Sequence, residues 1–145
     1  MKTQIFSTIR DVPKDKWNGL IEKHSFSYSH EFWEVIENSA LNDFNYRYVI
    51  FYDDTDNPIG LTTFYTVTTD IAIFAKNTLR RVLLSIRKFF PNFLKVRMLE
   101  CGTPITVNSP PLITSSLLPD PRLVHELGEM LISVAKAEGH FMIVI

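Results

Sequence analysis

The amino-acid sequence predicts an α/β (α+β) domain in which helices flank a central, mostly antiparallel sheet. Two aromatic and β-branched runs, Tyr46–Tyr52 and Ile59–Thr69, are separated by a short acidic turn and predict a hairpin. A strand-like run, Val96–Cys101, comes before the strongest helical pattern of the chain, residues 120–138. A fully apolar run, Phe141–Ile145, predicts one more strand. Together these patterns favour a sheet that buries its apolar residues against helices.

Composition limits the class of protein. The chain has 145 residues, of which 46% are hydrophobic and 21% charged, so we expect a single domain over residues 1–145. Such a composition excludes global disorder, and the net charge of −1 indicates neither a general nucleic-acid binder nor an acidic tail. The only cysteine, Cys101, excludes an intramolecular disulfide and fits a reducing compartment. No run approaches the roughly 18 apolar residues of a membrane span, and the start lacks a signal-peptide core. We therefore expect a cytoplasmic protein.

The first elements follow from local patterns. Thr3–Ile9 has the alternating character of a short strand, and Pro13 suits the first turn of a helix. That helix has one apolar stripe, which consists of Trp17, Leu20 and Ile21. Ser29 is a suitable N-cap for a second helix. The hairpin comes next, and its turn is the run Asp53–Pro58.

The second half of the chain continues with a basic segment. Thr78–Phe90 has the pattern of a basic amphipathic helix that ends before Pro91. After the strand Val96–Cys101 we expect a short β-like piece at Ile105–Val107 and then a loop over Asn108–Leu118.

The last helix has clear signals at both ends. Asp120 is a good N-cap, and Pro121 suits the first helical position. Gly139 is a typical end of a helix.

Charge is distributed unevenly along the chain. Residues 76–97 carry seven basic side chains and no acidic one, whereas residues 1–75 have a net charge of −5 and residues 98–145 one of −3. We therefore regard residues 76–95 as a basic helical insert.

Three stretches carry a resemblance to a known family. They are Ser25–Trp33 at the start of the second helix, Tyr46–Leu61 in the hairpin, and Met98–Pro104 at the end of a strand. With the order of the elements, they resemble the first two-thirds of the acyl-CoA N-acyltransferase fold of the GNAT superfamily. In particular, they are similar to the GNAT-like halves of FemAB-type acyltransferases.

The resemblance implies a transferase that passes an acyl group, acetyl or aminoacyl, to an amine acceptor. Acyl-CoA or aminoacyl-tRNA would be the donor substrate, and no cofactor would be permanently bound. GNAT enzymes typically cradle the cofactor pyrophosphate with a glycine-rich loop before the helix that follows the central strand. Here that place is Asn108–Asp120, which has no glycine, and Pro121 removes a further backbone donor. The alternative is a non-catalytic GNAT-like half that binds a partner, a polyanion or a membrane surface.

Two neighbouring residues are candidates for catalysis. Glu100, at the end of a strand, could accept the proton of an amine acceptor, and a solvated carboxylate is the alternative. Cys101 could act as a nucleophile if a base and a positive environment stabilised its thiolate; a half-buried structural cysteine is the alternative. His30-Glu31 begins like a zinc motif, but Glu34 occupies the place of the second histidine, so we expect no metal site.

The basic insert supplies the candidates for donor binding. Arg80, Arg81, Arg87 and Lys88 could contact the phosphates of coenzyme A or RNA. Alternatively, the amphipathic helix could lie on an anionic membrane surface, or pack on the sheet with a solvated basic face.

The apolar run at the end of the sequence leads to two further expectations. The resemblance stops before the last strands of the GNAT fold, so we expect a domain truncated after its fifth strand. The strand Phe141–Ile145 would then have an unpaired apolar edge and favour self-association.

Overall fold

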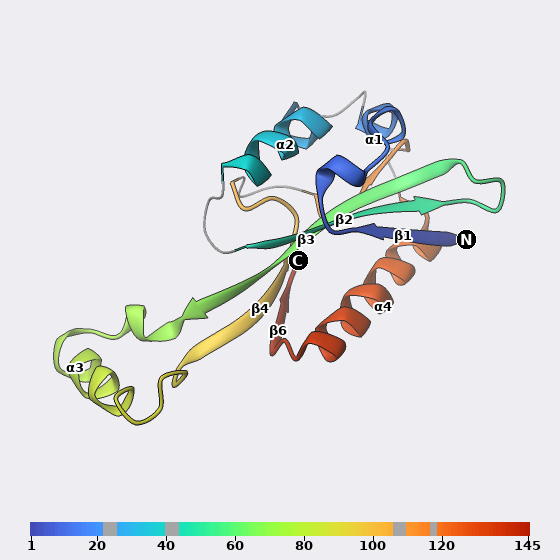
Figure 1. Cartoon of the computed structure of the whole chain (residues 1–145). Coiled ribbons are helices and arrows are strands. Elements are labelled where there is room, and N and C mark those ends of the chain that lie inside the picture. The colour runs from blue at the N-terminus through green and yellow to red at the C-terminus, as the bar shows by residue number, and fades with distance from the viewer. Residues whose placement is uncertain (22–25, 40–43, 106–109, 117–118) are drawn as a thin grey trace.

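The structure is a computed structural model that describes residues 1–21, 26–39, 44–105, 110–116 and 119–145. Six strands form one sheet with helices on both faces (Figure 1). The strands are β1 (Lys2–Phe6), β2 (Asn45–Tyr52), β3 (Pro58–Asp70), β4 (Lys95–Cys101), β5 (Ile113–Thr114) and β6 (Met142–Val144). The α-helices are α1 (Lys14–Ile21), α2 (His30–Asn38), α3 (Asn77–Ile86) and α4 (Pro121–Glu138). Short 3₁₀ turns are η1 (Ile9–Asp11), η2 (Phe26–Tyr28) and η3 (Ile71–Phe74).

The sheet is mostly antiparallel, as the sequence predicts. Its order is β1-β2-β3-β4-β6, and only β4 and β6 run parallel. The long strand β3 has two partners on the same side: its first half pairs with β5, and its second half pairs with β4. The sheet therefore divides where β4 ends and β5 begins.

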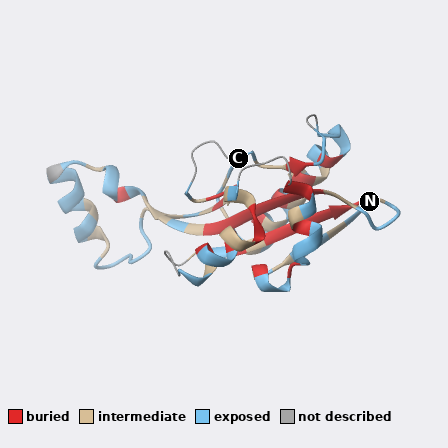
Figure 2. Cartoon of the chain, turned by 90° about the horizontal axis from the view of Figure 1, so that it is seen from above, coloured by how far each residue is buried: buried red, intermediate tan, exposed pale blue. Residues whose placement is uncertain are grey.

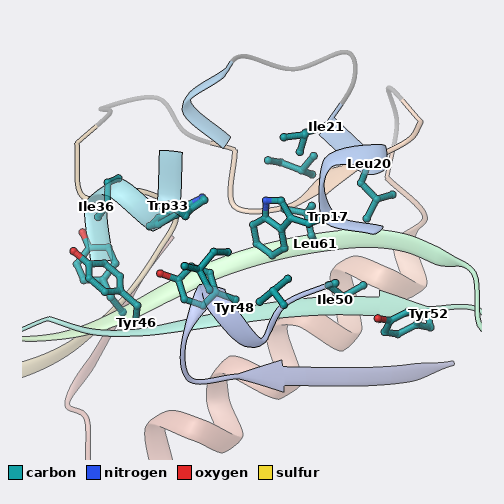
Figure 3. Packing of buried hydrophobic residues seen from close by; sticks show 14 residues of the cluster. Trp17, Leu20, Ile21, Trp33, Ile36, Tyr46, Tyr48, Ile50, Tyr52 and Leu61 are labelled. Carbon is teal, nitrogen blue, oxygen red and sulfur yellow. The ribbon is translucent and has the colours of Figure 1, made fainter. Parts of the chain in front are cut away.

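Successive side chains of β2 and β3 point to opposite faces of the sheet, so each face has its own core. Tyr46, Tyr48 and Ile50 lie under α1 and α2, where the indole rings of Trp17 and Trp33 cover them (Figure 3). The opposite face packs against α4, and its buried residues are Val49, Phe51, Phe64, Leu99, Leu123, Leu127, Leu131 and Ala135.

The predicted helix signals are confirmed at both well-capped helices. The Ser29 hydroxyl accepts a hydrogen bond from the Phe32 amide at the start of α2, and the Asp120 carboxylate accepts one from the Arg122 amide at the start of α4. Gly139 follows α4 with a φ of 70°, a left-handed conformation that glycine adopts without strain.

Several predicted boundaries differ from the structure. The first strand ends at Phe6, because Ile9 turns into η1 and is buried there. Within the predicted loop Asn108–Leu118 lies β5, a two-residue strand whose pattern is too short to recognise in sequence. The helix of the basic insert ends at Ile86 rather than Phe90. The predicted piece at 105–107 falls largely outside the described residues.

The distal halves of β3 and β4 carry residues 70–95 away from the helices that cover the sheet, and we call this segment the arm (Figures 1 and 2). It contains η3 and α3. The sequence left open whether α3 packs on the sheet, and the structure instead places it at the tip of the arm. No helix in the described part of the chain is long and apolar enough to cross a membrane.

Candidate functional site

Three polar side chains form a row across adjacent strands. Tyr46 on β2 is the register partner of Tyr65 on β3, and Tyr65 is the register partner of Glu100 on β4. Register partners point to the same face of a sheet, so all three side chains lie on the face that α1 and α2 cover. The row ends at Val144 of β6, which pairs with Glu100 in parallel.

The half-buried carboxylate of Glu100 accepts a short hydrogen bond from the Tyr65 hydroxyl. Burial first, and then the bond to Glu100, raise the pKa of the Tyr65 hydroxyl, which therefore stays protonated and donates. Burial also raises the pKa of Tyr46. The Tyr46 hydroxyl is buried and makes no hydrogen bond with the part of the chain that the structure describes. An unpartnered buried hydroxyl is costly and rare, and a catalytic or binding role is one explanation for it.

A second carboxylate on this face has a structural role. Glu37 of α2 accepts hydrogen bonds from the Thr8 hydroxyl, the Ile9 amide and the Tyr48 hydroxyl. These bonds join α2 to η1 and to β2, and they occupy three of the roughly four acceptor sites of the carboxylate. The sequence analysis did not single out Glu37, because its partners are distant in sequence. Glu100 accepts one hydrogen bond within the described ranges, from Tyr65, and therefore has more acceptor capacity left for a ligand than Glu37.

Cys101 lies on the opposite face from Glu100, although the two residues are adjacent in sequence. Its Sγ atom is 3.3 Å from the Thr62 hydroxyl and 3.5 Å from the Pro111 carbonyl oxygen. Burial raises the pKa of the Cys101 thiol. A raised pKa keeps the thiol protonated, whereas a nucleophilic cysteine needs its thiolate. The structure therefore does not bring the two catalytic candidates together.

A cavity of about 710 Å³ lies between α1, α4 and the segment that contains β5. This volume is within the range of small-molecule sites. Its walls are largely apolar, with hydroxyl groups from the β5 segment; they include Gly19, Leu20, Pro110, Pro111, Thr114, Ser115, Val124, Leu127, Gly128 and Ile145. Ile145 directly follows Val144, the register partner of Glu100. The cavity thus reaches the end of β6, the strand that pairs with β4 beside Glu100.

Two helix glycines line this cavity from opposite sides. Gly19 lies within α1 and Gly128 within α4, and a Cβ atom added at either position would meet no atom within 4 Å. Glycine in a helix interior destabilises the helix by roughly 0.5–1 kcal/mol relative to alanine. Packing does not require either glycine, so their effect is to widen the cavity.

The start of α4 offers little to a phosphate group. The Asp120 carboxylate occupies the first amide of the helix, and Pro121 has no N–H to donate. A negative charge and a missing donor oppose the usual binding of anions at a helix N-terminus.

The four basic candidates for donor binding lie on the arm, away from Glu100. Arg80 and Arg81 are exposed on α3, and Lys88 is exposed just after it. Arg87 instead donates two hydrogen bonds to Asp70, at 2.6 and 2.5 Å. At roughly 3.3 Å per residue, the arm begins at Lys95 about 17 Å along β4 from Glu100. The structure thus places these cations at a different location from the polar row.

The histidine of the incomplete zinc motif lies in the core. The Nε2 atom of His30 is 2.9 Å from the Ile9 carbonyl oxygen. Within the described ranges, no three histidine, cysteine or carboxylate side chains gather as metal ligands would.

Comparisons with known proteins concern mainly the fold. No family model matches the sequence. A curated protein from Mycobacterium tuberculosis, a putative 8-amino-7-oxononanoate synthase 2, is 28% identical over 81 residues. The match covers 56% of this chain but spans only 10% of that protein.

Two solved structures are similar over 99% of this chain. One is ribosomal-protein-alanine N-acetyltransferase from Brucella melitensis biovar Abortus 2308, with a TM-score of 0.57, 11% identity and 78% of that chain covered. The other is a tetramutant of the BH1408 protein from Bacillus halodurans, with a TM-score of 0.54, 10% identity and 81% of that chain covered. At such identities the likeness concerns the fold alone. The chain has the mixed α/β fold of the GNAT-type N-acetyltransferases.

Proposed function

We propose that this chain transfers an acyl group to an amine, and that Glu100 is the base that accepts the amine proton. The observation that carries the proposal is the row Tyr46–Tyr65–Glu100. It combines a half-buried carboxylate with a neutral hydroxyl that orients it and a second hydroxyl that is buried without a partner among the described residues. A positioned carboxylate of this kind suits general-base catalysis. The N-acetyltransferase fold supports the same reaction class.

In the proposed reaction, the amine nitrogen attacks the carbonyl carbon of an activated acyl donor. The new C–N bond forms as the bond between that carbon and the sulfur or oxygen of the carrier breaks. Glu100 takes the amine proton and passes it to the departing thiolate or alkoxide, so that the carboxylate is regenerated. Tyr65 holds the Glu100 carboxylate in place, and the Tyr46 hydroxyl, which has no partner in the described part of the chain, can bond to the acceptor or the acyl oxygen.

The cavity between α1 and α4 is the proposed place of the acyl chain. Its apolar walls and its position next to the end of the row suit the hydrophobic part of a donor. The donor is an acyl thioester such as acyl-CoA, or an aminoacyl ester of tRNA. The blocked start of α4 indicates that the phosphates of either donor would not bind there as in a glycine-rich loop.

The experiment measures amide formation by the full chain with acetyl-CoA, a longer acyl-CoA and an aminoacyl-tRNA, each with a panel of primary amines. Glu100→Gln keeps the shape of the side chain but cannot take a proton, so kcat should fall by about 10²–10⁴-fold while the donor still binds. Glu129→Gln, on the exposed face of α4, is the matched control and should keep the wild-type rate.

Two results would contradict this assignment. If Glu100→Gln keeps the full rate, Glu100 is not the base. If donors bind saturably but none is consumed, the non-catalytic alternative holds, which the blocked start of α4 also favours.

A further inference from the structure

Exposed apolar side chains are concentrated on the arm. Phe74, Phe89 and Phe90 are 74%, 82% and 66% exposed. Further exposed apolar residues of the same segment are Ile71, Ile73, Leu79, Val82, Leu84 and Phe93. Figure 2 shows the arm as mostly exposed, in contrast with the buried centre of the sheet. An apolar surface of this kind on a single segment usually marks an interaction site.

The arm also lies in the basic part of the chain. Residues 76–97 have a net charge of +7, and the remaining residues have a net charge of −8. Arg87 is neutralised by Asp70, so the cations of the arm that are left for a partner are Lys76, Arg80, Arg81, Lys88 and Lys95, and Arg97 follows just outside it. The partner that fits this charge is anionic, and it would repel the acidic remainder of the chain, residues 1–69 and 96–145, which we call the body.

Hydrogen bonds hold the arm in shape. The Arg87 guanidinium donates to Asp70 and, through Nε, to the Phe93 carbonyl oxygen at 2.9 Å. The Phe89 and Phe90 amides both donate to the Ile86 carbonyl oxygen, at 3.0 and 3.1 Å. The two rings are therefore presented by an ordered turn at the end of α3.

We propose that the arm docks on an anionic lipid surface, with α3 in the plane of the interface. On α3, Leu79, Val82 and Ile86 follow helical spacing and form one stripe, and Arg80 and Arg81 lie on the opposite, polar face. Helices that combine an apolar stripe with a cationic polar face bind in the headgroup region of anionic membranes. Phenylalanine rings at the tip would enter the acyl boundary, and the cations would contact lipid phosphates.

A lipid surface accounts for the exposed side chains of the arm better than RNA does. Cations and aromatic rings alone would also fit single-stranded RNA, whose bases stack on such rings. The exposed aliphatic residues Ile73, Leu79 and Val82 have no base to stack on, but they would be buried at a lipid interface. This inference is independent of acyl transfer and of Glu100.

The test is sedimentation of the full chain with vesicles of phosphatidylcholine alone and of phosphatidylcholine mixed equally with phosphatidylglycerol. We expect binding to the mixed vesicles only, and weaker binding at high salt. Arg80→Gln with Arg81→Gln should weaken it about 25-fold, at about 5-fold per cation. Phe89→Ser with Phe90→Ser should weaken it by at least about 10-fold.

Matched controls remove the same kinds of group from the body. Arg122→Gln with Lys136→Gln removes two exposed cations of α4, and Val35→Ser with Ile132→Ser removes two exposed aliphatic groups. Both pairs should keep wild-type binding. In addition, the indole introduced by Phe89→Trp should be quenched by brominated lipid in the mixed vesicles.

Three outcomes would overturn the proposal. The first is no binding to the mixed vesicles, or equal losses in the control pairs. The second is binding of an RNA oligonucleotide that the arginine pair weakens, without vesicle binding. The third is concentration-dependent self-association that the phenylalanine pair abolishes, again without vesicle binding, which would make a second copy the partner.

Discussion

The strand β3 runs through two regions of the molecule. The first buries its apolar side chains, and the second exposes them. Between Gly60 and Thr66 every residue of β3 is buried, because α1 and α2 cover one face of the sheet and α4 covers the other. Beyond Val67 the strand enters the arm, where η3 and α3 expose their apolar residues. Both regions contain Leu and Phe, but Leu61 and Phe64 are buried, whereas Leu79 and Phe89 are exposed. The difference teaches that the helices covering a segment, and not its composition alone, decide whether it forms core.

The largest expected effect is on the stability of the body. Trp33 is 1% exposed and packs edge-on against Tyr46 and Tyr48. Trp33→Ala should lower the free energy of unfolding by about 3–5 kcal/mol, since it removes a large buried ring and leaves a cavity. Urea denaturation measures the change.

The matched variant in the arm is Phe89→Ala. Its ring is 82% exposed, so the free energy of unfolding should change by no more than about 0.5 kcal/mol. A loss from Phe89→Ala as large as that from Trp33→Ala would show that the arm packs on the body.

A smaller effect is expected where β3 meets α4. A Cβ atom at Gly60 would lie 2.7 Å from the Leu123 Cδ2 atom, and Leu123 is buried. Gly60→Ala should therefore lower the free energy of unfolding by about 1–3 kcal/mol, the usual cost of overpacking. Thermal or urea unfolding of Gly60→Ala alone and combined with Leu123→Ala tests the cause: the combined loss should be smaller than the sum of the two. If the two losses in the free energy of unfolding simply add, the contact between the Gly60 position and Leu123 does not cause the effect.

An increase in stability is expected for a substitution that lines the cavity. Gly128→Ala adds a Cβ atom with nothing within 4 Å, so the free energy of unfolding should rise by about 0.5–1 kcal/mol.

Gly128→Leu would extend into the cavity and should weaken binding of a long acyl donor more than binding of acetyl-CoA. Equal binding of both donors by Gly128→Leu would contradict the proposed place of the acyl chain.

The smallest expected effect on stability comes from Asp70 at the base of the arm, and it depends on pH. The hydrogen bonds from Arg87 lower the pKa of Asp70 from an ordinary 3.8 to about 2. A carboxyl group whose pKa is lower in the folded state stabilises that state fully above its unfolded pKa, and this contribution is lost as the pH falls from about 4 to about 2. Carboxyl NMR titration should give a pKa near 2, and Arg87→Gln should return it toward 3.8. An ordinary pKa in the unaltered chain would show that Arg87 does not hold Asp70.

Much of the fold could be predicted because its signals are local. The turn Asp53–Pro58, the cap Ser29 and the Asp120-Pro121 pair each fix a boundary through neighbouring residues. The strand β5 could not be predicted, because two residues show no period and its partner Leu61 is distant in sequence.

The site could be predicted only in part. Glu100 was recognisable from its place at a strand end, but its partner Tyr65 depends on register between strands 35 residues apart. Register also decides that Cys101 points to the other face, although both residues are adjacent in sequence. The exposure of the arm depends on which helices cover the sheet, and no local pattern carries that information.

The central claim is that the body carries the chemistry and the arm does not. The Ile71 amide donates to the Leu94 carbonyl oxygen at 2.9 Å, so an Asn-Gly turn between these two residues can close the hairpin without the arm. The most direct measurement compares the rate of amide formation from acetyl-CoA and a soluble amine in this shortened chain and in Glu100→Gln. The account predicts a rate within about 3-fold of the full chain for the former and a loss of about 10²-fold or more for the latter. Loss of the rate in the shortened chain, with full activity in Glu100→Gln, would contradict it.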